Sequence, residues 1–126
     1  MKHLSILGST GSIGTSALDV VRRHPDRFRI RALTAANNLP LLCRQVDEFN
    51  PDMVAVLDEA KARKLSGMLT GSCRPEILSG DAGYVAAAAW HDTDTVLLAM
   101  VGAAGLKPAL AAIDAGKEIA LANKET

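Results

Sequence analysis

Short apolar runs alternate with helix-like runs along the whole 126-residue sequence, and this alternation constrains the fold more than any other feature. Each apolar run has the length of a strand, and each stretch between them has room for a crossover helix. Strands spaced in this way pair in parallel through right-handed crossovers. We therefore expect an α/β fold with a Rossmann-type, doubly wound, mainly parallel sheet flanked by helices, in one domain over residues 1–126. The predicted strands are 3–7, 29–34, 53–57, 76–80, 95–101 and 118–122.

The helices between these strands have recognisable faces and start signals. One apolar face of the first helix is formed by Ile13, Ala17, Val20 and Val21. Asn38 can cap the second helix. The strand at 95–101 is the most continuously apolar, so we expect it at the centre of the sheet, covered on both faces. The predicted helices are 12–23, the stretch that follows Asn38, 58–69, about 84–89, and 105–114.

The stretch GSTGSIG, residues 8–14, lies between the first strand and the first helix. In a phosphate-binding loop Gly8 would permit a tight turn, Gly11 would let the backbone approach a ligand, and Gly14 would let the helix pack closely on the sheet. The spacing G-x-x-G-x-x-G is one residue longer than the common dinucleotide fingerprint. An ordinary glycine turn is the alternative, but the strand before and the helix after favour a nucleotide.

The first turn of that helix offers the donors that a pyrophosphate needs. The N–H groups of Ser12 and Ile13 come before the helical hydrogen-bond ladder and lie at the positive end of the helix dipole. The hydroxyl groups of Thr10 and Ser12 could add further donors.

The end of the second strand bears on which nucleotide binds. A site specific for NAD usually has an acidic residue there, which holds the ribose 2′-hydroxyl. This sequence has no Asp or Glu between Arg29 and Asp47. The absence of a carboxylate favours NADP(H), although the local sequence AANN supplies no cation for a 2′-phosphate.

Composition argues against several classes of partner. Lys and Arg number 14 against 14 Asp and Glu, and aromatic residues are 3% of the chain, so nothing points to nucleic acid. No apolar run approaches the ~20 residues of a membrane span. Cys43 and Cys73 have neither metal-ligand nor disulfide-scaffold spacing, so we expect reduced thiols in a cytoplasmic protein.

Three stretches together resemble the N-terminal, NADPH-binding part of the 1-deoxy-D-xylulose 5-phosphate reductoisomerase family. They are ILGSTGSIGTSALDVVRRHPDRF at 6–28, MVGAAGLKPALAAIDAGK at 100–117 and LANKET at 121–126. The resemblance extends over essentially the whole chain. It implies an enzyme that rearranges and reduces a sugar phosphate, 1-deoxy-D-xylulose 5-phosphate, to 2-C-methyl-D-erythritol 4-phosphate in non-mevalonate isoprenoid biosynthesis.

The resemblance also implies roles for particular residues. The glycine loop would bind the NADPH pyrophosphate, through Gly8, Thr10, Gly11, Ser12 and Ile13. The loop after the second strand would border the 2′-phosphate, through Ala36, Asn37 and Asn38. Near the end of the sequence, Asn123 and Glu125 would lie by the nicotinamide, and Lys124 would reach the substrate.

One residue departs from the family pattern. Members commonly have Lys or Arg where this sequence has Asn37. A lost charge-assisted contact is worth about 1.5–3 kcal/mol, which corresponds to a roughly ten- to hundredfold weaker preference for NADPH over NADH. Arg31 is a candidate to compensate.

The family's remaining machinery follows the point where this sequence stops. The resemblance places the carboxylates for a divalent metal (Mg or Mn), a flexible lid and the substrate-phosphate residues in a later part of the chain. We therefore expect residues 1–126 to be a folded cofactor domain that is inactive alone, and the full-length enzyme to be a homodimer.

Two other functions remain open at this stage. One is the cofactor domain of another NADP-linked enzyme, such as a semialdehyde dehydrogenase or a homoserine dehydrogenase. The other is a nucleotide sensor without chemistry. A semialdehyde dehydrogenase would need a nucleophilic cysteine farther along its full-length chain, and neither Cys43 nor Cys73 falls in the expected crevice. We expect His3, His24 and His91 at the surface and Trp90 packed under the preceding helix.

Overall fold

The computed structural model of the chain describes residues 1–100 and 105–121 and contains one six-stranded sheet. Every pairing in it is parallel, and the strand order is β4-β3-β2-β1-β5-β6. The expected doubly wound α/β fold is therefore confirmed. The strands are β1 (Lys2–Leu7), β2 (Phe28–Thr34), β3 (Met53–Val56), β4 (Glu76–Ser79), β5 (Thr95–Leu98) and β6 (Glu118–Leu121).

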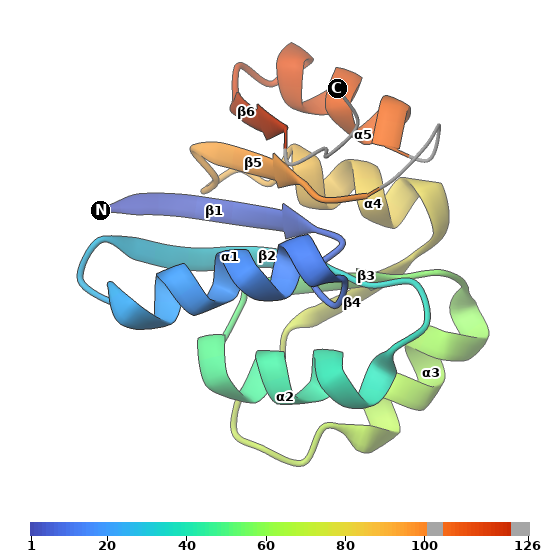
Figure 1. Cartoon of the computed structure of the whole chain (residues 1–126). Coiled ribbons are helices and arrows are strands. Elements are labelled where there is room, and N and C mark those ends of the chain that lie inside the picture. Colours follow the sequence, from blue (N-terminus) through green and yellow to red (C-terminus); the bar gives the residue numbers. More distant parts are fainter. Residues whose placement is uncertain (101–104, 122–126) are drawn as a thin grey trace.

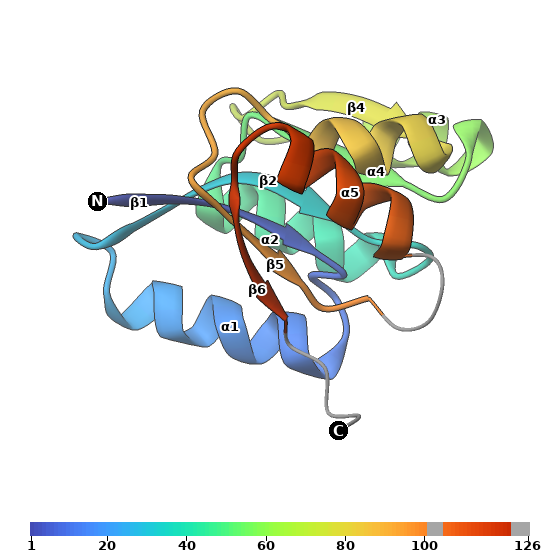
Figure 2. The same cartoon turned by 90° about the horizontal axis from the view of Figure 1, so that it is seen from above.

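Helices cover both faces of this sheet. Figure 2 shows α1 on one side of the sheet and α4 with α5 on the other. Since β1 is paired with β2 on one side and β5 on the other, the chain reverses its direction of winding at β1. The helices are α1 (Ser12–Arg23), α2 (Leu39–Phe49), α3 (Glu59–Met68), α4 (Gly80–Ala88) and α5 (Leu106–Asp114).

Two apolar clusters hold these layers together. On one face Leu18 of α1 and Leu42 of α2 pack with Ile6 and Leu33 of the sheet. Val20, expected on the apolar face of α1, is instead 48% exposed, because the buried stripe runs through Leu18 and Val21. On the opposite face residues of α4 and α5 pack on inward side chains such as Ala55. The alternation of side chains along β1 divides the strand between them, because Ile6 belongs to the first cluster and Leu7 to the second.

Side-chain caps begin two of the helices where the sequence indicates. The Asn38 side chain accepts a hydrogen bond from the Leu41 N–H (3.2 Å), as expected. Asp58 accepts one from the Lys61 N–H (2.9 Å), so it caps α3 instead of lying inside it. These short polar side chains satisfy donors that the first helical turn leaves open.

The fourth helix begins earlier than expected, at Gly80 instead of near Tyr84. Gly80 and Gly83 look like turn residues in the sequence, but Gly83 lies inside the helix. A β-carbon at Gly83 would be 3.1 Å from the Leu78 backbone and the Ala55 side chain. Gly83 therefore serves the close packing of α4 on the sheet.

The position predicted for the strand at 95–101 is wrong. β5 lies between β1 and β6, second from one edge, while β1 and β2 occupy the centre. Val96 and Leu98 are buried, but Thr95 and Leu97 are only half-buried. β3 is buried at all of its residues, because helices cover both of its sides.

The outer side of α5 is apolar and exposed. Leu106, Leu110 and Ile113 follow one another at helical spacing and are 61%, 53% and 59% exposed. The adjacent strand β6 is an edge strand of the described sheet, and its Leu121 is 74% exposed. This part of the molecule presents apolar surface to the solvent.

Candidate nucleotide-binding site

The glycine loop lies at the carboxyl edge of the sheet, where the winding reverses between β1 and β5. The arrowheads of β1 and β5 point to the same side in Figure 1, and the loop leads from there into α1. The Ala99 N–H donates to the Leu7 carbonyl (2.8 Å), so the ends of the two strands lie together. In open α/β sheets, ligands bind at this type of reversal point.

The first glycine makes the turn that the sequence predicts. Gly8 has φ +89°, a conformation that residues with a side chain rarely adopt. Its N–H donates to both the carbonyl (3.1 Å) and the hydroxyl (3.0 Å) of Thr34 in β2. A β-carbon at Gly8 would also lie 3.0 Å from the Ala99 backbone. The turn therefore requires glycine for two reasons: its φ angle is positive, and there is no room for a β-carbon.

The third glycine brings the helix against the loop itself. A β-carbon at Gly14 would lie 2.2 Å from the Gly8 carbonyl oxygen and 2.6 Å from the Ser9 Cα. Close packing at Gly14 is thus present, but the predicted partner was wrong: the helix start packs against the loop backbone and not against the sheet.

The second glycine and the start of α1 leave an open set of donors. The first hydrogen bond at the start of α1 runs from the Thr15 N–H to the Gly11 carbonyl (2.9 Å), so the N–H groups of Ser12 and Ile13 precede it. Gly11 is the N-cap and has no side chain, and the first turn has no acidic residue. A β-carbon at Gly11 would meet only the Gly8 oxygen, at 3.8 Å. This arrangement fits a pyrophosphate, which needs backbone donors and room.

The loop after β2 lies at the same edge of the sheet. Ala36, Asn37 and Asn38 are all exposed. The Asn38 side-chain oxygen is occupied as a helix cap, which leaves its amide N–H groups and the Asn37 side chain to face a ligand. No acidic side chain lies within this loop.

Arg31 does not take the place of a cation at Asn37. Its guanidinium donates to both oxygens of Asp52 (3.2 Å each) and to Nδ1 of His3 (2.8 Å). Asp52 precedes β3, so this cluster lies at the amino edge of the sheet. The hypothesis that Arg31 compensates at the 2′-phosphate is wrong, because β2 runs away from that cluster toward the loop that holds Asn37.

The residues predicted near the nicotinamide and the substrate, Asn123, Glu125 and Lys124, lie outside the described residues. Their roles stay predictions.

Two residues that support the loop were not found from the sequence. Ser9 and Gln45 are 0% and 4% exposed and are joined by two hydrogen bonds. The available signal was a polar residue between Leu42 and Val46 on the apolar face of α2. Periodicity alone does not reveal what such a residue contacts.

The cysteines lie away from this edge. The Cys43 thiol contacts the Met68 carbonyl (3.5 Å), and the Cys73 thiol contacts the Pro51 carbonyl (3.8 Å). Burial raises the pKa of both thiols, so neither has the character of a nucleophile.

Several other polar residues have structural partners. Trp90 packs against the α4 side of the core and donates through its indole N–H to Asp52 (3.0 Å). The carboxylate of Asp94 accepts from the His3 N–H (2.9 Å).

Across residues 1–100 and 105–121, no group of three or more His, Cys, Asp or Glu side chains could hold a metal ion. Over the same residues, no helix has both the length and the apolar character needed to cross a bilayer.

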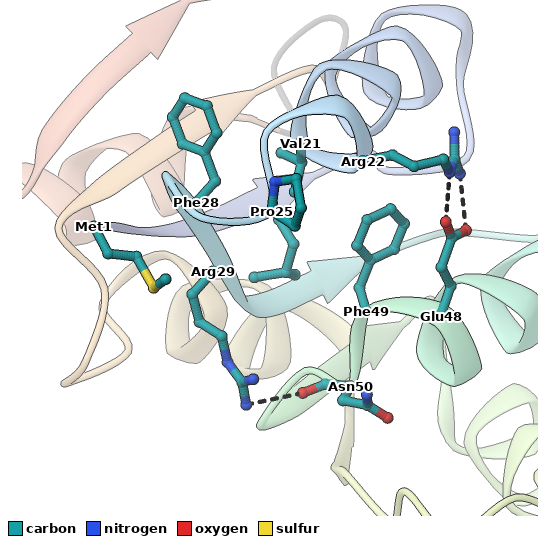
Figure 3. A pocket seen from close by; sticks show the side chains of 10 residues that line it. Met1, Val21, Arg22, Pro25, Phe28, Arg29, Glu48, Phe49 and Asn50 are labelled. Atoms are coloured by element: carbon teal, nitrogen blue, oxygen red, sulfur yellow. Dashed lines mark hydrogen bonds and ion pairs between the residues drawn. The ribbon is translucent and has the colours of Figure 1, made fainter.

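A cavity of about 390 Å³ lies at the opposite, amino edge. Figure 3 shows its largely apolar wall, to which Phe28, Pro25 and Phe49 contribute. The Arg22–Glu48 ion pair and the hydrogen bond from Arg29 to the Asn50 carbonyl (3.4 Å) lie at its border. None of its lining residues belongs to the glycine loop.

Comparison with known proteins agrees with this geometry. The family model for 1-deoxy-D-xylulose 5-phosphate reductoisomerase matches residues 4–126. The chain belongs to this family. The resemblance stated from the sequence motifs is thereby confirmed.

Individual relatives cover the whole chain but extend well beyond it. The 1-deoxy-D-xylulose 5-phosphate reductoisomerase of Geotalea uraniireducens (strain Rf4) is 60% identical over all of this chain, which spans 32% of that relative. The protein of the same name from Chlorobaculum tepidum is 59% identical, and the chain spans 33% of it. The chain therefore spans about a third of the length of the curated relatives it matches.

Solved structures show the same fold. A DOX-P reductoisomerase in complex with NADPH, fosmidomycin and magnesium has a TM-score of 0.93 and 44% identity, over 99% of this chain and 31% of that one. A 1-deoxy-D-xylulose 5-phosphate reductoisomerase from Zymomonas mobilis in complex with NADPH has a TM-score of 0.89 and 40% identity, over 98% and 32%.

Proposed function

We propose that this chain is the NADPH-binding domain of an enzyme that converts 1-deoxy-D-xylulose 5-phosphate to 2-C-methyl-D-erythritol 4-phosphate in non-mevalonate isoprenoid biosynthesis. The observation that carries the proposal is the open space at Gly11 beside the free N–H groups that begin α1. Family membership and the NADPH complexes of the two structural neighbours support it.

Two loops of the chain would bind different parts of the cofactor. In this proposal the N–H groups of the 10–13 segment hold the pyrophosphate, and the helix dipole of α1 stabilises its charge. The exposed 36–38 segment borders the adenosine 2′-phosphate. NADPH bound in this way supplies a hydride to the substrate-derived aldehyde. Asn123 and Glu125 would border the nicotinamide, and Lys124 would bind the sugar phosphate.

The remaining steps belong to the rest of the protein. This chain spans about a third of the length of its relatives, and a structural neighbour is in complex with magnesium, so we infer that the divalent metal, Mg or Mn, would be bound by another part of the protein. We infer that residues 1–126 form one domain without activity of their own. The whole protein would act on a small sugar phosphate as a cytoplasmic homodimer, with neither nucleic acid nor membrane as a partner.

Calorimetric titration with NADPH and with NADH tests this function. We expect clear NADPH binding and a preference over NADH that Asn37 weakens by roughly tenfold or more. Gly11→Ala fills the proposed phosphate space without a clash inside the protein, so it should abolish binding and leave the melting temperature unchanged.

Gly67→Ala is the matched control, because a β-carbon there would meet no atom within 4 Å and Gly67 lies in α3, outside the proposed site. It should bind NADPH as the unaltered protein does. Normal binding by the Gly11→Ala protein would refute the assignment of the loop.

A further inference from the structure

A buried pair of polar residues connects the glycine loop to helix α2. Gln45 comes from the middle of α2, on the face that also buries Leu42 and Val46 in the core. Ser9 is the second residue of the loop and is fully buried. The two residues are 36 positions apart in sequence, and the packing of α2 beside the loop brings them together.

The pair is held by two hydrogen bonds in opposite directions. The Ser9 hydroxyl donates to the Gln45 side-chain oxygen (2.7 Å), and the Gln45 amide nitrogen donates to the Ser9 carbonyl (2.9 Å). Reversing the amide would place its oxygen against the Ser9 carbonyl, so one orientation satisfies both partners. Glutamine therefore fits this position in a way that no apolar residue can.

These bonds complete the anchoring of Ser9. Its N–H donates to the Thr34 carbonyl of β2 (2.8 Å), so the backbone donor, the backbone acceptor and the hydroxyl are all engaged. The loop is thus fastened to β2 on one side and to α2 on the other. Gly14 rests on this same segment, since its β-carbon position lies 2.6 Å from the Ser9 Cα.

We propose that Gln45 is a positioning residue for the phosphates of the nucleotide. By holding Ser9 it fixes the direction of the N–H groups that follow in the 10–13 segment. A loop that is ordered before the ligand arrives binds it more tightly, because less conformational freedom is lost on binding. This inference rests on the proposed function, since it concerns the same loop.

Stability and affinity can be separated at this pair. Gln45→Met is similar in length and apolar, and it suits the surrounding core, but it removes both bonds to Ser9. Ser9→Ala removes the hydroxyl bond and keeps the bond to the carbonyl. In the double variant, Ser9→Ala with Gln45→Met, no hydroxyl is left without a partner. Part of the lost stability should therefore return, while the loop still lacks its hydrogen bonds to α2.

The experiment measures NADPH affinity and melting temperature together in the full-length protein. We expect Gln45→Met to weaken NADPH binding about tenfold, with KM for NADPH raised and kcat little changed. Ser9→Ala should have a smaller effect. The double variant should melt at a higher temperature than Gln45→Met and bind NADPH as weakly.

Val46→Ala is the matched control, because Val46 is the next residue of α2, is fully buried and has no side-chain polar atom. It should lower the melting temperature and leave NADPH affinity unchanged. The inference is overturned if Gln45→Met binds as the unaltered protein does, or if Val46→Ala loses as much affinity. If the unaltered protein fails to bind NADPH, the proposed function itself is refuted, and the inference with it.

Discussion

The two edges of the sheet handle polar groups in opposite ways. At the amino edge several charged side chains have partners within the protein: Arg31 donates to Asp52 and His3, Trp90 donates to Asp52, and Lys2 donates to Glu118. At the carboxyl edge the loop between β1 and α1 has backbone donors that come before the helical ladder, and the first turn of α1 has no acidic residue.

This difference separates polar groups that stabilise the fold from those available to a ligand. A donor with a protein partner gains little from a new one, whereas an exposed donor at a helix start is ready to bind an anion. The amino edge holds these ion pairs, yet the proposed nucleotide site lies at the other edge. Changes at the two edges should therefore alter different properties.

The largest effect is expected from Gly14→Ala at the carboxyl edge. The added methyl group would lie 2.2 Å from the Gly8 carbonyl oxygen, and backbone atoms would have to move. We expect a loss of about 3 kcal/mol in the free energy of unfolding and loss of NADPH binding. Urea unfolding and calorimetric titration measure the two. Normal NADPH affinity in this variant would break the link between loop geometry and binding.

A smaller effect is expected from Asp52→Ala at the amino edge. It removes the partner of the Arg31 guanidinium and of the Trp90 indole N–H, both partly buried. We expect a loss of about 1–2 kcal/mol in the free energy of unfolding, measured by urea denaturation, with NADPH affinity unchanged.

Asp52→Asn keeps an acceptor and should lose less stability than Asp52→Ala. A fall in NADPH affinity for either variant, beyond the fraction of unfolded protein, would contradict the separation between the edges.

The smallest effect is expected from acid at the amino edge. The hydrogen bond from Lys2 lowers the pKa of Glu118, and the hydrogen bond from the His3 N–H lowers the pKa of Asp94. Both carboxyls bind protons more weakly in the folded state than in the unfolded state. Their stabilising contribution is present above the ordinary carboxyl pKa, about 4, and is lost as the pH falls through the lowered values.

Melting temperatures over this acid range test the effect. Glu118→Gln removes one of the two groups, so its melting temperature should fall less steeply with acid than that of the unaltered protein. Equal slopes would mean that this exposed pair contributes nothing to the pH dependence. NADPH affinity at neutral pH should be the same for both proteins.

Local sequence patterns were sufficient for the order of the elements, for most of their bounds and for the turn geometry of the glycine loop. The spacing of apolar residues in α1, the capping side chain of Asn38 and the glycines of the 8–14 segment each record a requirement of their own neighbourhood. Such requirements can be read over a few residues, because helix periodicity, capping and tight turns involve near neighbours only.

The tertiary structure alone decided which distant residues meet. An apolar run indicated a buried strand but not its place, so β5 was expected at the centre and lies beside the edge strand β6. Arg31 looked available for a phosphate until β3 placed Asp52 beside it. In the sequence Gln45 is a polar residue on an apolar helix face, and only the packing of α2 shows that its partner is Ser9. These partners depend on strand order and on the stacking of helices over the sheet, and no short stretch of sequence contains that information.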